Sequence, residues 1–100
     1  MDHRSLTANM AVVDNPSERR FEVRLGDAVA FASYRLVDNL IVFTHTEVPV
    51  SLRRRGIANR LVRGALDSSR ARGLKVRSEC PYVTAFLQRH PDYRDLLAPG

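Results

Sequence analysis

Three side chains that can move protons or attack a carbonyl group lie near the ends of two expected strands. His45 and Glu47 are two residues apart in the apolar segment LIVFTHTEVPV (40–50), and Cys80 ends the segment LKVRSEC (74–80). Because side chains alternate between the two faces of a strand, we expect His45 and Glu47 on the same face. A histidine or a carboxylate accepts a proton from an amine, and a thiol acts as a nucleophile or an acid. These residues are therefore our candidate catalytic group.

Each candidate also has an ordinary structural interpretation. For His45 it is a partly buried histidine with satisfied hydrogen bonds, and for Glu47 it is an ion pair with an arginine. For Cys80 it is a buried, inert thiol. Tyr82 is a further candidate acid, and its alternative is packing at the start of a helix. The sequence does not decide which residue is the base.

The stretch LRRRGIAN (52–59) follows an expected strand and opens an expected helix. A helix N-terminus offers free backbone N–H groups and a partial positive charge, so it binds anions. Gly56 and Ala58 are small enough to let a phosphate approach the backbone. Arg53, Arg54 and Arg55 add formal charge, and Asn59 is a candidate cap or phosphate ligand. The alternatives are a solvated surface cluster and a nucleic-acid footprint.

The elements that must position these residues follow from hydrophobic periodicity and turn signals. Apolar alternation or β-branched runs predict strands, helical stripes predict one long and one short helix, and Gly73 is the expected end of the long helix. The expected strands are 10–14, 19–25, 28–37, 40–50 and 74–80, and the expected helices start at Ile57 and Pro81. This order predicts an α/β (α+β) fold: a mixed, mostly antiparallel sheet with one long helix after the central strand and a short C-terminal helix.

The composition suits one small globular domain. The chain has 100 residues, 44% of them hydrophobic, a net charge of +5 and a single cysteine. We expect a flexible leader over residues 1–12 and a single domain over 13–100. The positive charge favours anionic partners. The lone cysteine, with neither a signal peptide nor a membrane span in the sequence, predicts a cytoplasmic protein with no membrane partner. We assign no metal ligands.

The spacing Arg53-x-x-Gly56-x-Ala58 matches the pyrophosphate loop Arg/Gln-x-x-Gly-x-Gly/Ala of the GNAT superfamily of acyl-CoA N-acyltransferases. The resemblance continues through separate stretches in the right order. They are HTEVP (45–49), RGIAN.LV (55–62), GLKV (73–76), CPYV (80–83) and RHPDY (89–93). Over residues 18–97 the chain resembles the small, single-domain, YjdJ-type members of this superfamily.

The resemblance implies that the protein binds acetyl-CoA (coenzyme A) and transfers acetyl to an unidentified amine or protein acceptor, with Cys80 as an optional intermediate carrier. It places pyrophosphate on the backbone of residues 54–59, pantetheine beside the central strand, and the carbonyl oxygen on a backbone N–H near Val48. The implied cofactor-binding residues are Val48, Val50, Arg53, Arg54, Arg55, Gly56, Ile57, Ala58 and Asn59.

Two departures from the superfamily pattern leave alternatives open. Phe86 stands at the position where many superfamily members carry a tyrosine that acts as the general acid. A turn at Asn15–Arg20 stands where larger members carry two helices. A non-catalytic acyl-CoA-binding or sensing module is therefore the second interpretation. A basic nucleic-acid-binding domain is the third, and it is disfavoured because no RNA-binding aromatic motif accompanies the arginines. The sequence is compatible with a homodimer.

Overall fold

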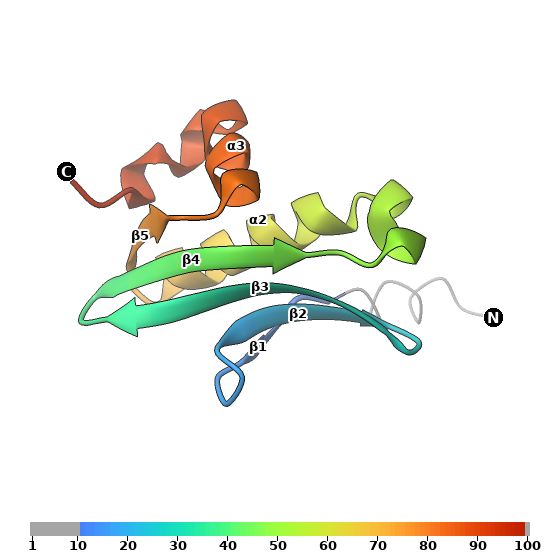
Figure 1. The fold of residues 1–100 in the computed structure, drawn as a ribbon. Coiled ribbons are helices and arrows are strands. Elements are labelled where there is room, and N and C mark those ends of the chain that lie inside the picture. Colours follow the sequence, from blue (N-terminus) through green and yellow to red (C-terminus); the bar gives the residue numbers. More distant parts are fainter. Residues whose placement is uncertain (1–10, 100) are drawn as a thin grey trace.

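The computed structural model describes residues 11–99, apart from the side chains of residues 54 and 55. The chain forms a five-stranded sheet with helices after its fourth and fifth strands (Figure 1). The elements are β1 (Val13–Asn15), β2 (Arg20–Leu25), β3 (Ala28–Val37), β4 (Leu40–Glu47), the 3-10 helix η1 (Val50–Arg55), α2 (Ile57–Ala71), β5 (Lys75–Ser78), α3 (Pro81–Arg89) and the 3-10 helix η2 (Pro91–Leu96).

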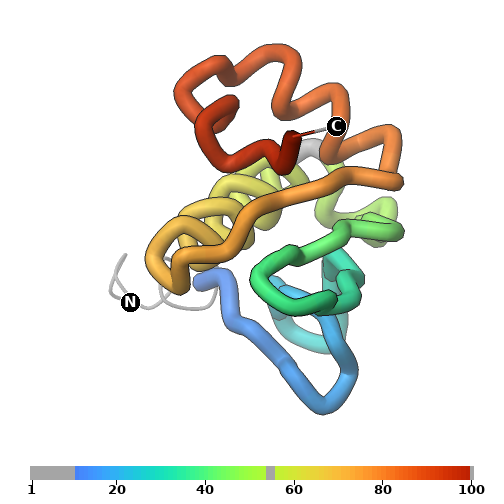
Figure 2. The backbone as a smooth tube through the Cα atoms, turned by 90° about the vertical axis from the view of Figure 1, so that its left-hand side faces the viewer, coloured from blue at the N-terminus to red at the C-terminus, as the bar shows by residue number. Residues whose placement is uncertain are grey.

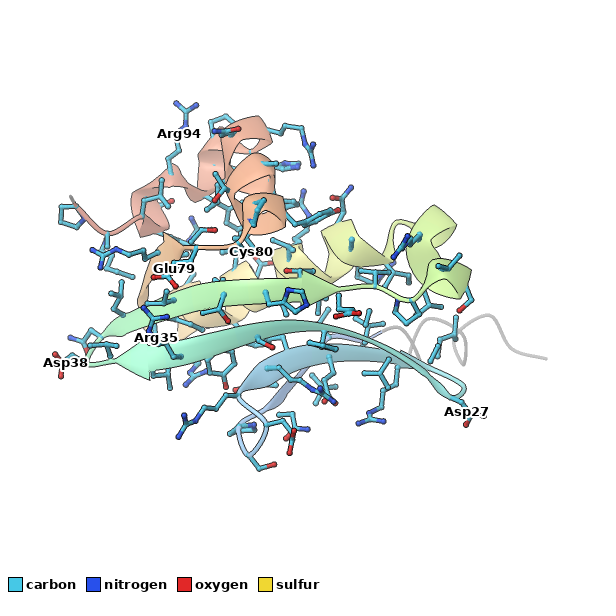
Figure 3. All side chains as sticks on the ribbon, viewed as in Figure 1. Asp27, Arg35, Asp38, Glu79, Cys80 and Arg94 are labelled. Carbon is cyan, nitrogen blue, oxygen red and sulfur yellow. The ribbon has the colours of Figure 1, made fainter. Side chains whose placement is uncertain are left out.

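The strands lie in the order β1-β2-β3-β4-β5, which is also their order in the chain. The first four pair antiparallel through short turns, whereas β5 pairs parallel with β4. A parallel pair needs a long crossover connection, and α2 supplies it. Figure 3 shows Asp27 and Asp38 at opposite ends of the sheet, at the two turns that bound β3. The predicted fold class, a mixed and mostly antiparallel sheet with one long helix, is confirmed.

Helix α2 lies along one face of the sheet, and α3 lies beside it (Figures 1 and 2). The buried residues of α2 recur with helical spacing; they are Ile57, Leu61, Val62, Ala65, Leu66 and Ser69. Gly73 has a left-handed φ of 71°, and its N–H donates to the carbonyl oxygen of Arg70 at 3.1 Å. Glycine adopts this conformation without steric cost, so Gly73 ends the helix as the sequence predicts.

A polar contact ties the edge of the sheet to the end of α2. The Tyr34 hydroxyl donates to Asp14 Oδ1 at 2.7 Å, and Arg72 donates to the other carboxylate oxygen of Asp14 at 3.3 Å. Burial, together with the Asp14 carboxylate, raises the pKa of Tyr34 to about 12. The neutral phenol is therefore the form that the fold stabilises.

The predicted strand 40–50 is too long. Strand β4 ends at Glu47, and η1 occupies Val50–Arg55, so α2 does not follow the strand directly. Pro49 precedes η1 with φ −55° and ψ 146° and has no N–H for a sheet ladder, which ends the strand. Val50 is 74% exposed. Apolar residues alone predicted the longer strand, and the proline decides against it.

Two further predicted boundaries shift. The first strand covers Val13–Asn15 rather than 10–14, because pairing with β2 selects these residues, and Met10 is outside the described residues. Strand 74–80 shortens to Lys75–Ser78, because its pairing with β4 stops at Ser78.

The expected leader falls mostly outside the described part, which begins at residue 11. Val12, assigned to the leader, packs against the core cluster, and a Cβ at Gly64 of α2 would lie 2.6 Å from its Cγ2. Among residues 11–99, no helix combines the length and apolarity needed to cross a bilayer.

A β-bulge in β4 decides which side chains face the helices. Tyr34 pairs with Phe43 and Ser33 pairs with His45, so Thr44 is an extra residue without a partner on β3. The Thr44 hydroxyl donates to the Ser33 carbonyl oxygen at 3.3 Å. A bulge shifts the alternation of the strand by one residue. Before it, Phe43 faces the core, and after it Thr46 does, opposite buried Ala32.

Candidate functional site

A cleft opens where β4 and β5 separate. Their pairing stops at Phe43 and Ser78, so the rest of β4, residues 44–47, pairs with β3 along one edge only. The cleft beside this free edge has a volume of about 540 Å³. Its lining comes from β4, the loop after it, η1 and the starts of α2 and α3: His45, Thr46, Glu47, Val48, Arg53, Ala58 and Tyr82.

His45 and Glu47 lie on the same face of β4, as the alternation predicted. The distance from His45 Nε2 to Glu47 Oε2 is 2.9 Å, and the side chains are 60% and 61% exposed. An ionised carboxylate only accepts hydrogen bonds, so the Nε2–H of His45 donates to Glu47. In the neutral ring, Nδ1 is then the basic nitrogen. The pair is arranged as a proton acceptor with a fixed tautomer.

Cys80 lies behind this pair rather than beside it. The residue is 3% exposed and does not line the cleft. Its thiol is 3.4 Å from Thr46 Oγ1, and Thr46 itself does line the cleft. Figure 3 shows Cys80 where the chain passes from β5 into α3. The Thr46 side chain therefore lies between this thiol and the cleft.

The loop before α2 presents its backbone. Gly56 has φ 65° and ψ 21°, and no atom lies within 4 Å of the position that a Cβ would take. None of the described side chains caps α2, whose first N–H groups have no partners within the helix. Arg53 Nε donates to the Val48 carbonyl oxygen at 3.0 Å and so ties η1 to the end of β4.

The candidate loop residues divide by environment. Ile57 is fully buried and contributes its side chain to the core, so only its backbone faces a ligand. Ala58 lines the cleft, whereas Gly56 and Asn59 line a second hollow along α2 of about 520 Å³. Asn59 Oδ1 accepts a hydrogen bond from the Tyr82 hydroxyl at 3.0 Å. This bond joins the start of α2 to the start of α3.

Two positions on α3 have opposite environments. Phe86 is fully buried and stacks on His90, with ring centroids 4.0 Å apart. Tyr82 is half-buried and its side chain lines the cleft. Phe86 has no ionisable proton, and the phenol of α3 that borders the cleft is Tyr82. Within the described residues, no group of His, Cys, Asp and Glu side chains is arranged to hold a metal ion.

Thr46 was missed by the sequence analysis. It lines the cleft and contacts the Cys80 thiol, yet simple alternation from buried Phe43 places it on the outer face. The bulge that reverses this depends on pairing with β3, and no local sequence signal marks it. The contact between the Thr46 hydroxyl and the Cys80 thiol is therefore a feature of the tertiary structure.

The separated parallel strands, the free edge between them and the glycine turn at a helix start define the fold of the GNAT class of acyltransferases. The chain belongs to the family described as GCN5-related N-acetyl-transferase, whose model matches residues 20–96. The predicted resemblance is thereby confirmed.

Relatives and a solved structure agree with this assignment. The chain is 37% identical over 86 residues to Protein NATD1 of Homo sapiens, covering 81% of this chain and 76% of the relative. It is 31% identical to Protein NATD1 of Xenopus tropicalis, covering 99% and 95%. The solution NMR structure of a GCN5-like protein from Staphylococcus aureus superposes with a TM-score of 0.71 at 25% identity, covering 93% of this chain and 92% of that one.

Proposed function

We propose that this protein binds acetyl-CoA in the cleft between β4 and β5 and transfers the acetyl group to an amine. The observation that carries the proposal is the hydrogen-bonded pair His45–Glu47 on the rim of that cleft, beside a free strand edge. A proton acceptor at a site for an extended ligand is what amine acetylation requires.

The residues present fit acetyl-CoA. The cleft volume of about 540 Å³ lies within the usual range for small-molecule sites. The uncapped start of α2 and the open space above Gly56 suit a pyrophosphate group. The backbone of residues 54–59 would hold it, with formal charge from Arg53, Arg54 and Arg55. The free edge of β4 and Val48 would hold the pantetheine arm. Val50 would lie beside the pantetheine arm, and Asn59 would lie beside the pyrophosphate.

When bound, acetyl-CoA supplies the acetyl group as an activated thioester. His45 Nδ1 accepts the proton that the attacking amine loses. Glu47 accepts the Nε2–H bond, which fixes the tautomer and stabilises the ring once it is protonated. A backbone N–H near Val48 would stabilise the carbonyl oxygen on which negative charge develops. These roles all lie at the end of β4.

The thiolate that leaves must regain a proton. Tyr82 is the nearer candidate, since it lines the cleft and its hydroxyl is held at 3.0 Å by Asn59. Cys80 is the second candidate and also the candidate acyl carrier. Its 3% exposure means that acylation requires Thr46 to move aside.

Thermal unfolding with and without acetyl-CoA tests the binding half of the proposal. We expect acetyl-CoA to raise the melting temperature of the wild type and of Gly26→Ala, but not of Gly56→Ala. The two glycines make a matched pair, because both have a left-handed φ (62° and 65°) and open space at the Cβ position. Both substitutions carry the same backbone strain, about 1–2 kcal/mol. No shift of the wild type at millimolar acetyl-CoA would refute the proposal.

Mass spectrometry tests the transfer. The protein is incubated with acetyl-CoA and a panel of amines, and acetylated amine, free thiol and acetyl adducts on Cys80 are measured. Turnover by both the wild type and Cys80→Ser supports direct transfer to the amine, and turnover lost in Cys80→Ser supports the carrier route. Binding without turnover or adduct would instead support the non-catalytic acyl-CoA-binding module.

A further inference from the structure

The side of the sheet away from α2 carries an ordered row of side chains that starts at the cleft. We name it the open face and define it by residues Arg20, Glu22, Arg24, Phe31, His45 and Glu47. In Figures 1 and 2 no described helix lies over this side of β2 and β3. The strand register places Glu47 opposite Phe31, and Phe31 opposite Glu22. The row therefore crosses three strands from the cleft outward.

Contacts along the row hold it in place. The rings of His45 and Phe31 meet edge to face, with centroids 6.1 Å apart. The Arg20 guanidinium carbon lies 4.5 Å from the centroid of Phe31. Such aromatic and cation–π contacts fix ring and guanidinium orientation. Phe31 thus joins the His45–Glu47 pair to a basic group two strands away.

A buried carboxylate organises that basic group. Glu22 is 4% exposed and accepts hydrogen bonds from Arg20 Nε at 2.7 Å, Arg24 Nε at 3.2 Å and Asn15 Nδ2 at 3.1 Å. Burial opposes its ionisation, but the hydrogen bonds from Arg20 and Asn15 and the charges of both arginines outweigh it and lower the pKa of Glu22. Two guanidinium groups surround one carboxylate, so this end of the face keeps a net positive charge.

The open face is therefore dipolar: Glu47 lies at the cleft, and the Arg20–Arg24 pair lies two strands away. Neighbouring strands are about 4.8 Å apart, so the two ends are separated by roughly 10 Å. In an extended polypeptide, side chains two residues apart share a face and are roughly 6.6 Å apart. A hydrogen bond of about 2.8 Å at each end lets such a pair of side chains span the open face.

Resting on the proposed function, we propose that the acceptor is a polypeptide amine with an acidic side chain two residues away, on the same face of an extended segment. Its ammonium group meets Glu47 and His45 at the cleft, and its carboxylate meets the preorganised guanidinium groups of Arg20 and Arg24. An arginine pairs with a carboxylate through directed, charge-assisted hydrogen bonds. The net charge of +5 favours the encounter with an acidic partner.

Fluorescence anisotropy with labelled peptides tests the proposal independently of catalysis. Three peptides carry one lysine and differ only elsewhere: glutamate two residues away, glutamine at that position, or glutamate directly adjacent and therefore on the other face. We expect the first to bind about tenfold or more tightly than the other two, the scale of a charge-assisted hydrogen bond. Equal affinities for the three peptides would overturn the proposal.

Matched variants locate the binding surface. Arg20→Gln and Arg24→Gln are each expected to abolish the preference for glutamate, while each leaves Glu22 one arginine partner. Arg94→Gln is the control, because it removes an equal charge on η2, far from β2 in Figure 3. Equal loss in all three variants would mean general electrostatic attraction and would overturn the proposal. Binding is measured without cofactor, so failure of acetyl-CoA to stabilise the protein stays a separate result.

Discussion

Arg35 and Glu79 form a two-bond ion pair that reaches across β4. Arg35 Nη1 and Nη2 donate to the two carboxylate oxygens of Glu79, each at 3.0 Å. The Glu79 N–H also donates to the Phe43 carbonyl oxygen at 2.8 Å. Hydrogen bonds from Arg35 hold the pKa of Glu79 below its usual value and raise that of Arg35. The pair fastens β3 to the residue just before Cys80, where β5 leaves the sheet.

Removing the Arg35–Glu79 ion pair should make the Cys80 thiol more accessible to reagents. With Glu79→Gln we expect the chain between β5 and α3 to open more often, so the Cys80 thiol reacts several-fold faster with a disulfide reagent. The thiol is 3% exposed, and reaction requires such opening. Since Cys80 is the only cysteine, the release of coloured thiolate reports on it alone. The control is Glu18→Gln, which replaces an exposed glutamate in the β1–β2 turn. Equal thiol reaction rates for both variants would contradict this role of the Arg35–Glu79 ion pair.

Replacing Glu47 should slow transfer without weakening acetyl-CoA binding. Glu47→Gln keeps the shape but loses the charge that fixes the His45 tautomer. We expect kcat to fall by about 10²-fold, the lower end for general base catalysis, with the melting shift by acetyl-CoA retained. The kcat of His45→Gln should fall at least as far, because this substitution removes the proton acceptor itself. An unchanged kcat in Glu47→Gln would contradict this role.

Glu22 should make the free energy of unfolding decrease as the pH falls in the acidic range. Its folded-state pKa is lower than in the unfolded chain, so its contribution is present above about pH 4.5 and is lost as the pH falls through the folded value. We expect Glu22→Gln to lower the free energy of unfolding at pH 7 by about 1–3 kcal/mol and to flatten its acidic decline. Urea unfolding at several pH values measures both. A parallel decline in wild type and variant would contradict the assignment.

Residue 64 should have to be glycine because Val12 packs against it, and not because the helix favours glycine there. In α2, alanine is intrinsically better than glycine by about 1 kcal/mol. A Cβ at residue 64 would nevertheless lie 2.6 Å from Val12 Cγ2 and 2.7 Å from Val12 Cβ. We expect Gly64→Ala to destabilise the protein by about 1–3 kcal/mol, as overpacking does.

A double-mutant cycle tests the Val12–Gly64 contact. Val12→Gly should restore the stability of Gly64→Ala, because it removes every atom of the clash. Val12→Ala should restore only part, since its Cβ stays 2.7 Å from the new methyl group. Denaturant unfolding gives the coupling energy, and additive effects would show that the contact is absent in solution.

Local patterns predicted most of the fold. The alternation of β2 and β3 and the helical stripe of α2 are matched by the structure, and Gly73 ends α2 as expected. Each of these signals lies within one element, because backbone geometry alone sets its period. The start of α2 at Ile57 was likewise predicted, whereas the role of residues 53–58 in holding pyrophosphate stays a prediction.

The arrangement at the cleft depended on contacts between distant segments. Alternation counted from buried Phe43 would turn His45 and Glu47 toward the core. The bulge at Thr44 turns them outward and turns Thr46 toward Cys80 instead. The burial of Cys80 likewise depends on where β5 leaves the sheet. The sequence by itself determined which chemical groups lie near the ends of the strands. Only the tertiary structure decided which face of the sheet they occupy, because a bulge is a property of strand pairing and not of one strand.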